Sequence, residues 1–277
     1  MKIKKQRLDV LLVERGLVET REKAKRTIMA GLVFSNETRL DKPGEKIAID
    51  LPLQVKGNPL PYVSRGGLKL EKALAEFRLT VKDKVMLDIG ASTGGFTDCA
   101  LQNGAKMVYA LDVGYNQLAW KLRNDPRVVV MERTNFRYVK PENLDGGMPS
   151  FATIDVSFIS LTLILPVLKG LLTPESDVIA LIKPQFEAGR EEVGKKGIVR
   201  EKTIHVKVVD KIKQFSLQQG YDIQNVSFSP ITGGEGNIEF LIHLSWSGFV
   251  NQNGSGSDFS AISTIEVVEQ AHNQFGK

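Results

Sequence analysis

The sequence predicts an α/β fold, in which a small α+β module precedes a mostly parallel sheet of seven strands. Short apolar, β-prone runs alternate with helical segments from about residue 85 onward, a pattern typical of parallel strands that are buried on both faces. The last two candidate strands have no helix between them, so the final strand should pair antiparallel. A length of 277 residues also fits two domains.

Composition excludes several classes of protein. Hydrophobic residues make up 42% of the chain and charged residues 25%, which excludes a disordered or coiled-coil chain. The single cysteine, Cys99, excludes an intramolecular disulfide, and no Cys/His spacing suits a structural zinc site, so we expect no metal. The N-terminus does not resemble a signal peptide, and the longest apolar-rich stretch, residues 159–172, is too short to span a bilayer. We therefore expect a cytoplasmic protein without membrane partners.

Positive charge is concentrated at the start of the chain. Residues 1–60 hold 13 Lys and Arg against 8 Asp and Glu, a balance of +5, whereas residues 61–277 hold 24 of each. Such a distribution suggests that the first module binds a polyanion, although a solvated basic surface would have the same composition.

The first module should contain two short helices followed by two strands. Gly16 is placed to stop the first helix, and Thr20 is a good N-cap for the second. We expect the helices around residues 8–12 and over 21–30, and the strands over 32–35 and 46–51.

The stretch RLDVLLVERGLVETREKAKRTIMAGLVFSN resembles the S4 RNA-binding domain. The shared pattern is a leading Arg-Leu-Asp, a turn with Gly, a capped Thr-Arg helix, and a strand that ends in Asn. This resemblance implies that an exposed basic helix face binds structured RNA through phosphate and shape contacts. We assign residues 1–60 to an S4-like RNA-binding domain, with these candidate RNA-binding residues: Arg7, Arg21, Lys23, Lys25 and Arg26.

The second domain, residues 61–248, should start with a helix over about 68–77. The predicted strands are 85–89, 107–113, 128–131, 151–156, 178–182, 223–228 and 239–246, and the clearest helices are 95–102, 161–171 and 203–219. Residues 249–277 are expected to be a flexible Gly/Ser-rich tail with a short helix over 262–275.

The segment VMLDIGASTGGFTDCAL predicts a strand, a glycine-rich turn and a helix. Gly90, Gly94 and Gly95 allow the backbone to approach a ligand closely, and the helix start offers amides to an anionic group. Asp112 closes the next strand 22 residues after Gly90, where a carboxylate can accept hydrogen bonds from ribose hydroxyls. These features indicate a cofactor that contains a nucleoside.

The glycine loop does not match the GxGxxG pattern of dinucleotide enzymes. An LDIGxxxGG loop with Asp88 two residues before the glycine instead resembles motif I of S-adenosylmethionine-dependent methyltransferases, whose Rossmann-like sheet also ends in an antiparallel strand. The cofactor implied is S-adenosyl-L-methionine. Asn135 could contact its adenine or could simply be a turn residue. The candidate cofactor-binding residues are Asp88, Gly90, Ser92, Thr93, Gly94, Gly95, Asp112 and Asn135.

Several motifs in order together resemble the TlyA family: YVSRGGLKL, LDIGASTGGF, ALDVGYNQL, RTNFR, DVSFISL, LIKPQFE and GNIEF. The resemblance covers residues 7–246. It implies a ribosomal RNA 2′-O-methyltransferase that acts on cytidine, with an FtsJ-like catalytic domain and ribosomal RNA or ribosomal subunits as partners. Members are often called haemolysins.

The resemblance also implies a catalytic tetrad of Lys69, Asp155, Lys183 and Glu239. Asp155 and Lys183 end predicted strands, where open α/β sheets place their ligands. Lys183 follows the apolar run VIALI and should be partly buried, whereas Lys69 alone would pass for a solvated helix residue. We expect Lys183 to lie nearest the 2′-hydroxyl, but the sequence leaves open which lysine is the base.

Two alternative functions remain at this stage: a membrane-active haemolysin, and a non-catalytic RNA-binding or ribosome-assembly protein. The sequence does not indicate the modified nucleotide, the ribosomal subunit or the oligomeric state.

Overall fold

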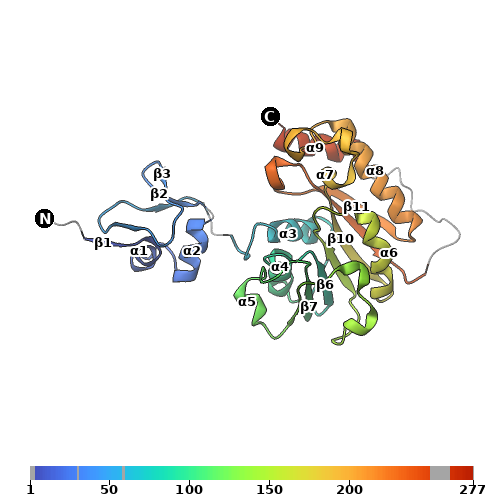
Figure 1. Cartoon of the computed structure of the whole chain (residues 1–277), viewed down its shortest axis with the longest axis horizontal. Helices are drawn as coiled ribbons and strands as arrows, with labels where there is room; N and C mark the ends of the chain where they lie inside the picture. Colours follow the sequence, from blue (N-terminus) through green and yellow to red (C-terminus); the bar gives the residue numbers. More distant parts are fainter. Residues whose placement is uncertain (1–3, 30, 58–59, 250–262, 277) are drawn as a thin grey trace. The chain divides into compact units, whose positions relative to one another are not determined.

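A computed structural model describes residues 4–29, 31–57, 60–249 and 263–276. The chain forms two compact units, residues 1–63 and 64–277, which are described separately below (Figure 1).

The first unit is a small α+β domain. Its core contains Leu8, Leu11 and Leu12 from the first helix and Ile28 from the second. Thr20 caps the second helix, because its Oγ1 accepts a hydrogen bond from the Lys23 backbone amide at 3.1 Å. β1 pairs antiparallel with β4, and β2 lies between β3 and β5. The elements are β1 (Lys5–Arg7), α1 (Leu8–Glu14), α2 (Arg21–Met29), β2 (Val33–Ser35), β3 (Thr38–Arg39), β4 (Lys46–Ala48) and β5 (Gln54–Val55).

The second unit contains the predicted seven-stranded mixed sheet, in the order β11-β12-β10-β9-β6-β7-β8. The five strands from β10 to β8 in this order are parallel, and β12 pairs antiparallel with both β10 and β11, which confirms the expected antiparallel end. The strands are β6 (Val85–Ile89), β7 (Met107–Leu111), β8 (Val128–Met131), β9 (Phe151–Ile154), β10 (Ser176–Ile182), β11 (Asp222–Phe228) and β12 (Phe240–Trp246).

Helices cover both faces of this sheet (Figure 1). Strand alternation divides the side chains between the faces: Leu87 and Ile89 pack into the core with α8 and α9, while Asp88 turns toward α4. The helices are α3 (Gly67–Glu76), α4 (Gly95–Gln102), α5 (Trp120–Arg123), α6 (Leu165–Leu168), α7 (Pro184–Glu187), α8 (Lys202–Gln218) and α9 (Thr264–Phe275).

The predicted helix over residues 161–171 is three short pieces in the structure: η3 (Leu161–Leu163), α6 and η4 (Lys169–Leu171). Pro166 stands in the first turn of α6, and its missing amide and its ring prevent a continuous helix through this position. The apolar side chains remain buried, because Leu161, Leu165 and Leu168 still pack into the core.

The C-terminal segment differs from the expected tail. Helix α9 packs against α8 and β11, with Val268 and Ala271 buried in the core, so residues 263–276 belong to the second unit. The flexible linker predicted before α9 lies outside the described residues apart from Phe249. In the described part of the chain, no helix is long and apolar enough to cross a membrane.

Candidate active site

Four parallel strands place the residues that follow them at one edge of the sheet. Gly90 follows β6, Asp112 follows β7, Asp155 follows β9 and Lys183 follows β10. β12 runs in the opposite direction, so Glu239, which precedes it, lies at the same edge; its neighbour Phe240 pairs with Ile182, the residue before Lys183. Ligands of open α/β sheets bind at this edge.

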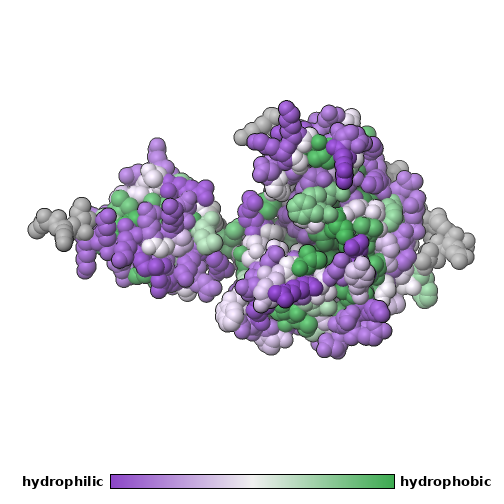
Figure 2. Space-filling model, in the orientation of Figure 1, coloured by the Kyte–Doolittle hydropathy of each residue, from purple (hydrophilic) through white to green (hydrophobic). Residues whose placement is uncertain are grey.

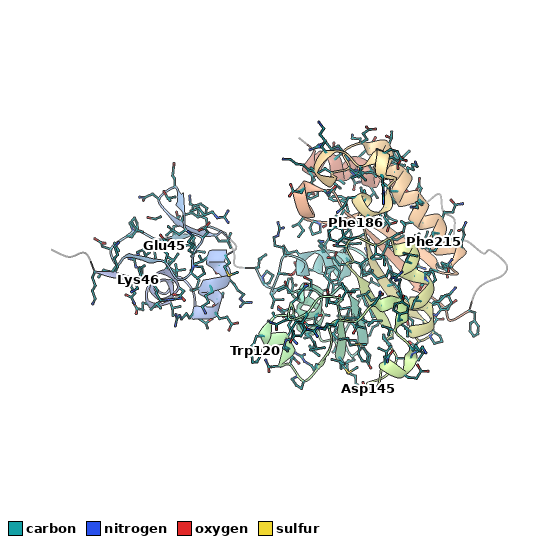
Figure 3. All side chains as sticks on the ribbon, viewed as in Figure 1. Glu45, Lys46, Trp120, Asp145, Phe186 and Phe215 are labelled. Atoms are coloured by element: carbon teal, nitrogen blue, oxygen red, sulfur yellow. The ribbon has the colours of Figure 1, made fainter. Side chains whose placement is uncertain are left out.

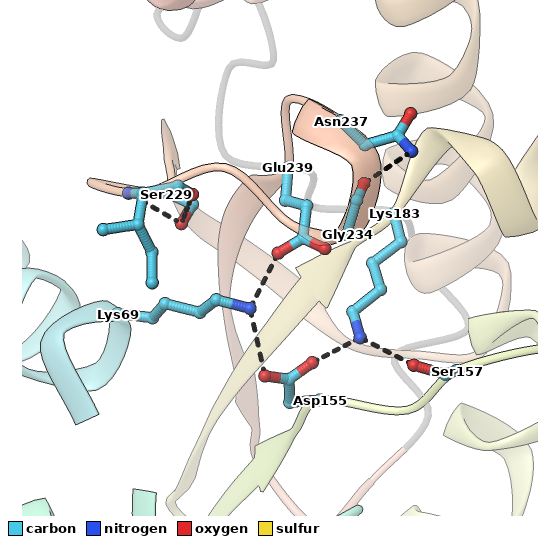
Figure 4. A network of polar contacts seen from close by, with 9 residues as sticks. Lys69, Asp155, Ser157, Lys183, Ser229, Gly234, Asn237 and Glu239 are labelled. Carbon is cyan, nitrogen blue, oxygen red and sulfur yellow. Dashed lines mark hydrogen bonds and ion pairs between the residues drawn. The ribbon is translucent and has the colours of Figure 1, made fainter. Parts of the chain in front are cut away.

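The four residues of the predicted tetrad form one connected network in the structure (Figure 4). Lys69 Nζ, on α3, lies 2.7 Å from Glu239 Oε2 and 3.2 Å from Asp155 Oδ2. Lys183 Nζ lies 2.5 Å from Asp155 Oδ1. Asp155 therefore joins the two lysines, one at each carboxylate oxygen.

Burial and charge act in opposite directions within this network. Burial alone would lower the pKa of Lys69, but the charges of Asp155 and Glu239 outweigh it, and the net pKa is raised. Burial alone would raise the pKa of Asp155, but the two neighbouring lysines reverse the effect and lower its pKa. Lys69 is therefore held as a cation and Asp155 as an anion.

Ser157 is a site residue that the sequence analysis missed. Lys183 Nζ donates a hydrogen bond to Ser157 Oγ at 3.1 Å, so this nitrogen contacts one carboxylate and one neutral hydroxyl (Figure 4). The signal in the sequence was its position two residues after Asp155, in the loop that leaves the same strand.

A cavity of about 360 Å³ surrounds the tetrad. Its wall includes all four tetrad residues, every residue of the glycine loop 90–95 except Gly94, and Ser64 and Arg65 ahead of α3. The segment Ile231–Gly234, just before the last strand, closes another side. The sequence analysis did not predict this segment, although its glycines are a typical sign of backbone that lies close to a ligand.

A second cavity, of about 420 Å³, adjoins the first and shares Gly90, Ser92, Asp155 and Ser157 with it. Its walls are mainly apolar and include Ile89, Leu111, Phe136 and Ile164. Two further predicted polar residues, Asp112 and Asn135, line this cavity alone. An apolar cavity with a few polar groups is typical of a small-molecule site.

The glycine loop packs closely against neighbouring protein backbone. Gly90 has a φ of +86°, and a Cβ there would lie 2.5 Å from the Asp155 carbonyl oxygen. A Cβ on Gly95 would lie 2.8 Å from the Gly67 amide nitrogen. Gly90, Ser92, Thr93 and Gly95 line the cavities, whereas Gly94, in the left-handed N-cap position of α4, does not.

Asp88 does not line either cavity, so the structure does not support direct contact with a cofactor. Its carboxylate is buried and accepts hydrogen bonds from Thr97 Oγ1 at 2.7 Å and from Thr153 Oγ1 at 2.9 Å. Strand alternation explains the difference, because a residue two before the turn still belongs to β6 and points toward α4. Asp88 joins β6, β9 and α4 beneath the loop.

Asp112 and Asn135 both contribute to the geometry of the loops around the apolar cavity. Asp112 accepts hydrogen bonds from the backbone amides of Ser92 at 2.8 Å and Gly114 at 2.7 Å. Each carboxylate oxygen has a second lone pair, so Asp112 can still accept hydrogen bonds from a ligand. Asn135 caps η1 (Phe136–Tyr138) through the Arg137 amide, which is the turn role, and it lines the cavity as well.

In the first unit, two of the predicted RNA-binding arginines share one buried acid. Asp9 accepts hydrogen bonds from Arg7 Nε at 2.9 Å and from Arg21 Nε at 3.0 Å. The side-chain hydrogen bond from Arg7 is the main reason that the pKa of Asp9 falls to about 2; the guanidinium of Arg21 lowers it further, and burial opposes both. The side chains of Arg7 and Arg21 remain about half exposed, at 42% and 54%.

The other predicted RNA-binding residues lie on α2. Lys25 and Arg26 are exposed, and Lys23 forms an ion pair with Glu19 at 3.1 Å. On the face seen in Figure 2, the first unit presents mostly hydrophilic side chains. This geometry fits a surface that contacts phosphates.

Comparisons with known proteins agree with the fold and the division into two domains. A family model described as FtsJ-like methyltransferase matches residues 62–246, and a model of the S4 domain matches residues 6–50. Among solved structures, "Putative hemolysin from Streptococcus thermophilus" aligns with a TM-score of 0.77 and 57% identity, covering 99% of this chain and 98% of that one.

Two curated relatives carry names that state an activity. "Putative rRNA methyltransferase YqxC" of Bacillus subtilis is 70% identical over 272 residues, which cover 98% of this chain and 96% of the relative. "16S/23S rRNA (cytidine-2'-O)-methyltransferase TlyA" of Mycobacterium tuberculosis is 42% identical over 239 residues, which cover 86% of this chain and 89% of the relative. The chain therefore belongs to the TlyA/haemolysin A family, in which an S4 domain precedes an FtsJ-like, S-adenosylmethionine-dependent methyltransferase domain.

Proposed function

We propose that this protein transfers a methyl group from S-adenosylmethionine to the 2′-hydroxyl of a cytidine ribose in ribosomal RNA. The observation that carries the proposal is the buried network of Lys69, Asp155, Lys183 and Glu239, which opens into a cavity that adjoins the apolar cavity beside Asp112. The name of the Mycobacterium tuberculosis relative states this substrate for that protein, and the S4 domain supports an RNA partner here.

The residues of the apolar cavity fit the cofactor. Gly90 lets the loop pack against the Asp155 backbone beside the cavity, the apolar walls would hold the adenine, and Asp112 would accept hydrogen bonds from the cofactor ribose. When bound, S-adenosylmethionine supplies an activated methyl group on a sulfonium. The protein must then orient the ribose oxygen in line with this group and help to remove its proton.

The contacts suggest different roles for the two lysines. Lys69 contacts two carboxylates, which raise its pKa and hold it as a cation, so we assign it an orienting and electrostatic role. Lys183 contacts a single carboxylate oxygen and the neutral Ser157 hydroxyl, and it lines the tetrad cavity. We assign Lys183 to the 2′-hydroxyl, whose proton passes to Nζ when that nitrogen is in its amine form. Asp155 and Glu239 hold the two side chains in position.

Lys183→Ala tests this assignment. The variant should fold and bind both S-adenosylhomocysteine and RNA, yet lose at least about 10²-fold in the single-turnover rate of methyl transfer to ribosomal RNA. Lys183→Arg should also fail, because a guanidinium does not readily give up its proton at neutral pH. Lys72→Ala is a matched control, because Lys72 is a half-buried lysine on α3 that hydrogen-bonds to the Phe228 carbonyl and does not line either cavity.

Two results would contradict the proposed chemistry. A Lys183→Ala rate within a few-fold of the unmodified protein would remove this lysine from the mechanism, whereas an active Lys183→Arg variant would favour a purely electrostatic role. RNA binding without any methyl transfer by the unmodified protein would support the alternative of a non-catalytic RNA-binding protein, and leakage of liposomes would support a membrane-active haemolysin.

A further inference from the structure

We propose that Glu132 is a positioning residue for the cofactor, because its carboxylate shapes the loop 113–119 that forms one wall of the apolar cavity. Glu132 comes directly after β8, the outermost strand of the parallel set. It does not line either cavity, whereas Val113 and Gln117 of the loop do. Glu132 would therefore act through the loop, without contact to the cofactor. This inference rests on the cofactor cavity and not on the identity of the RNA.

The Glu132 carboxylate binds successive amides of this loop. Oε2 accepts a hydrogen bond from Asn116 N at 2.9 Å, and Oε1 accepts from Gln117 N at 3.0 Å and Leu118 N at 3.3 Å. Arg123 on α5 adds an ion pair at 2.6 Å to Oε1. Successive amides that converge on one anion form a fixed local geometry, which the loop would lose without the charge.

This carboxylate is ionised at any pH at which the protein would work. The side chain is only 9% exposed, and burial alone would raise its pKa. Hydrogen bonds from the loop amides and from Arg123 outweigh that effect and lower the pKa of Glu132 to about 2. The loop is thus built around a permanent negative charge.

The same loop is connected to the residues that face the cofactor. Ser92 Oγ donates to Gln117 Oε1 at 3.3 Å, and the Ser92 amide donates to Asp112 Oδ2 at 2.8 Å. Ala119 N donates to the Thr93 carbonyl at 3.1 Å. The wall, the glycine loop and Asp112 therefore form one hydrogen-bonded assembly. Without Glu132, the backbone amides of the loop would hydrogen-bond to water instead. Cofactor binding would then have to order the loop, which would lower the affinity.

A set of full-length variants separates this role from simple stabilisation. Glu132→Ala removes every contact, and Glu132→Gln keeps the shape but removes the charge and turns an amide donor toward a backbone amide. Arg123→Met removes only the ion pair and leaves the bonds to the loop. Asp125→Ala is a matched control on the neighbouring turn, where Asp125 accepts from the Arg127 amide at 2.9 Å and from its guanidinium at 2.8 Å without lining a cavity.

Calorimetric titration with S-adenosylhomocysteine provides the readout, with thermal unfolding of each ligand-free protein beside it. We expect Kd to rise at least about tenfold in Glu132→Ala and Glu132→Gln, and to stay within about twofold in Arg123→Met and Asp125→Ala even where these unfold at a lower temperature. In turnover, KM for S-adenosylmethionine should rise while kcat at saturation stays close to that of the unmodified protein.

Two outcomes would overturn the proposal: an unchanged Kd in Glu132→Gln, or an equal loss of affinity in Arg123→Met, which would assign the effect to the ion pair. If Glu132→Ala does not fold, the Kd of Glu132→Gln for S-adenosylhomocysteine tests the proposal by itself. An unmodified protein that does not bind S-adenosylhomocysteine would overturn the cofactor cavity and this proposal together. Failure to methylate ribosomal RNA would leave the binding result intact and would count against the proposed function alone.

Discussion

Asp88 shows how a buried charge at a strand end can serve the architecture under a site. Its two carboxylate oxygens accept hydrogen bonds from Thr97 on α4 and Thr153 on β9, so a single side chain fixes the helix and two strands that carry the glycine loop. Burial is the main cause that raises the pKa of Asp88 to about 6, and the nearby charge of Asp155 adds to it. The ionised form is therefore maintained at a cost in stability.

Replacing Asp88 with Asn should change how stability depends on pH. The folded pKa of about 6 lies above the ordinary value of 3.8, so ionisation costs stability as pH rises from about 4 to 6, by roughly 3 kcal/mol. Asn does not ionise, so urea unfolding should show the free energy of unfolding of Asp88→Asn gaining on the unmodified protein over this range. Asp125→Asn should show the opposite trend, and below about pH 4, because the hydrogen bond to Arg127 lowers the pKa of Asp125 from its ordinary value of 3.8. A difference for Asp88→Asn that does not vary with pH would contradict the prediction.

Residue types after strand ends were the most informative part of the sequence. Asp112, Asp155 and Lys183 could be placed because parallel strands bring their carboxyl ends together. Glu239 was assigned through the family resemblance alone, and the structure places it at the same edge because β12 runs in the opposite direction. Asp88 and Glu132 could not be assigned this way. The role of Asp88 depends on its contact with Thr153, and the role of Glu132 depends on its contacts with the amides of a loop some 15 residues earlier. No local sequence pattern shows such tertiary contacts.

At the scale of elements, α9 (Thr264–Phe275) completes the covering of the sheet. Val268 and Ala271 pack with residues of α8 and β11 in one core, and His272 Nε2 lies 2.9 Å from His205 Nδ1 on α8. The sequence predicted this helix but not that it packs against α8 and β11. An apolar stripe shows that one face of a helix is buried, but not which elements bury it. Residues 250–262, which come before the N-cap Ser263 of α9, lie outside the described part of the chain.

The histidine pair predicts that acid weakens the docking of α9. Burial is the main cause that lowers the pKa of His205 to about 4, and the charge of His272 lowers it further. The unfolded chain takes up this proton near pH 6.5 and the folded protein only near 4, so the contribution to stability is full above about 6.5 and is lost as pH falls toward 4, by roughly 3 kcal/mol. The thermal unfolding temperature of His205→Leu should therefore change less between about pH 7 and 4.5 than that of the unmodified protein. An identical pH dependence in the two proteins would show that His205 is not the group responsible.

At the scale of the whole molecule, the net positive charge lies in the first unit and the candidate active site lies in the second. The cavities and the tetrad are formed entirely by residues of the second unit, whose charged residues balance, while the net excess of +5 lies in residues 1–60. The second unit also shows hydrophobic side chains on the face seen in Figure 2. One exposed hydrophobic side chain of this unit is Trp120 of α5, which is 76% exposed (Figure 3). RNA affinity and cofactor affinity should therefore respond to different substitutions.

Salt dependence can test this division. Lys25 and Arg26 are exposed on α2, and if both contact phosphates, replacing the pair with Ala should flatten the slope of log Kobs against log salt by about 1.5, since each phosphate contact contributes about 0.7 to 0.9. Adding Arg21→Ala and Lys23→Ala should flatten it by about 3 in total. S-adenosylhomocysteine affinity should not change in either variant, because none of these residues lines a cavity.

The control for this measurement is an equal loss of charge elsewhere on the protein. Lys82 and Lys106 are exposed near the amino ends of β6 and β7, at the edge of the sheet opposite the tetrad, so replacing both with Ala removes the same charge without touching the predicted RNA surface. This pair should leave the salt slope nearly unchanged, whereas a general response to net charge would flatten it as much as the α2 pair does. Equal slopes for the two pairs would mean that the slope follows net charge, and would contradict specific phosphate contacts by Lys25 and Arg26.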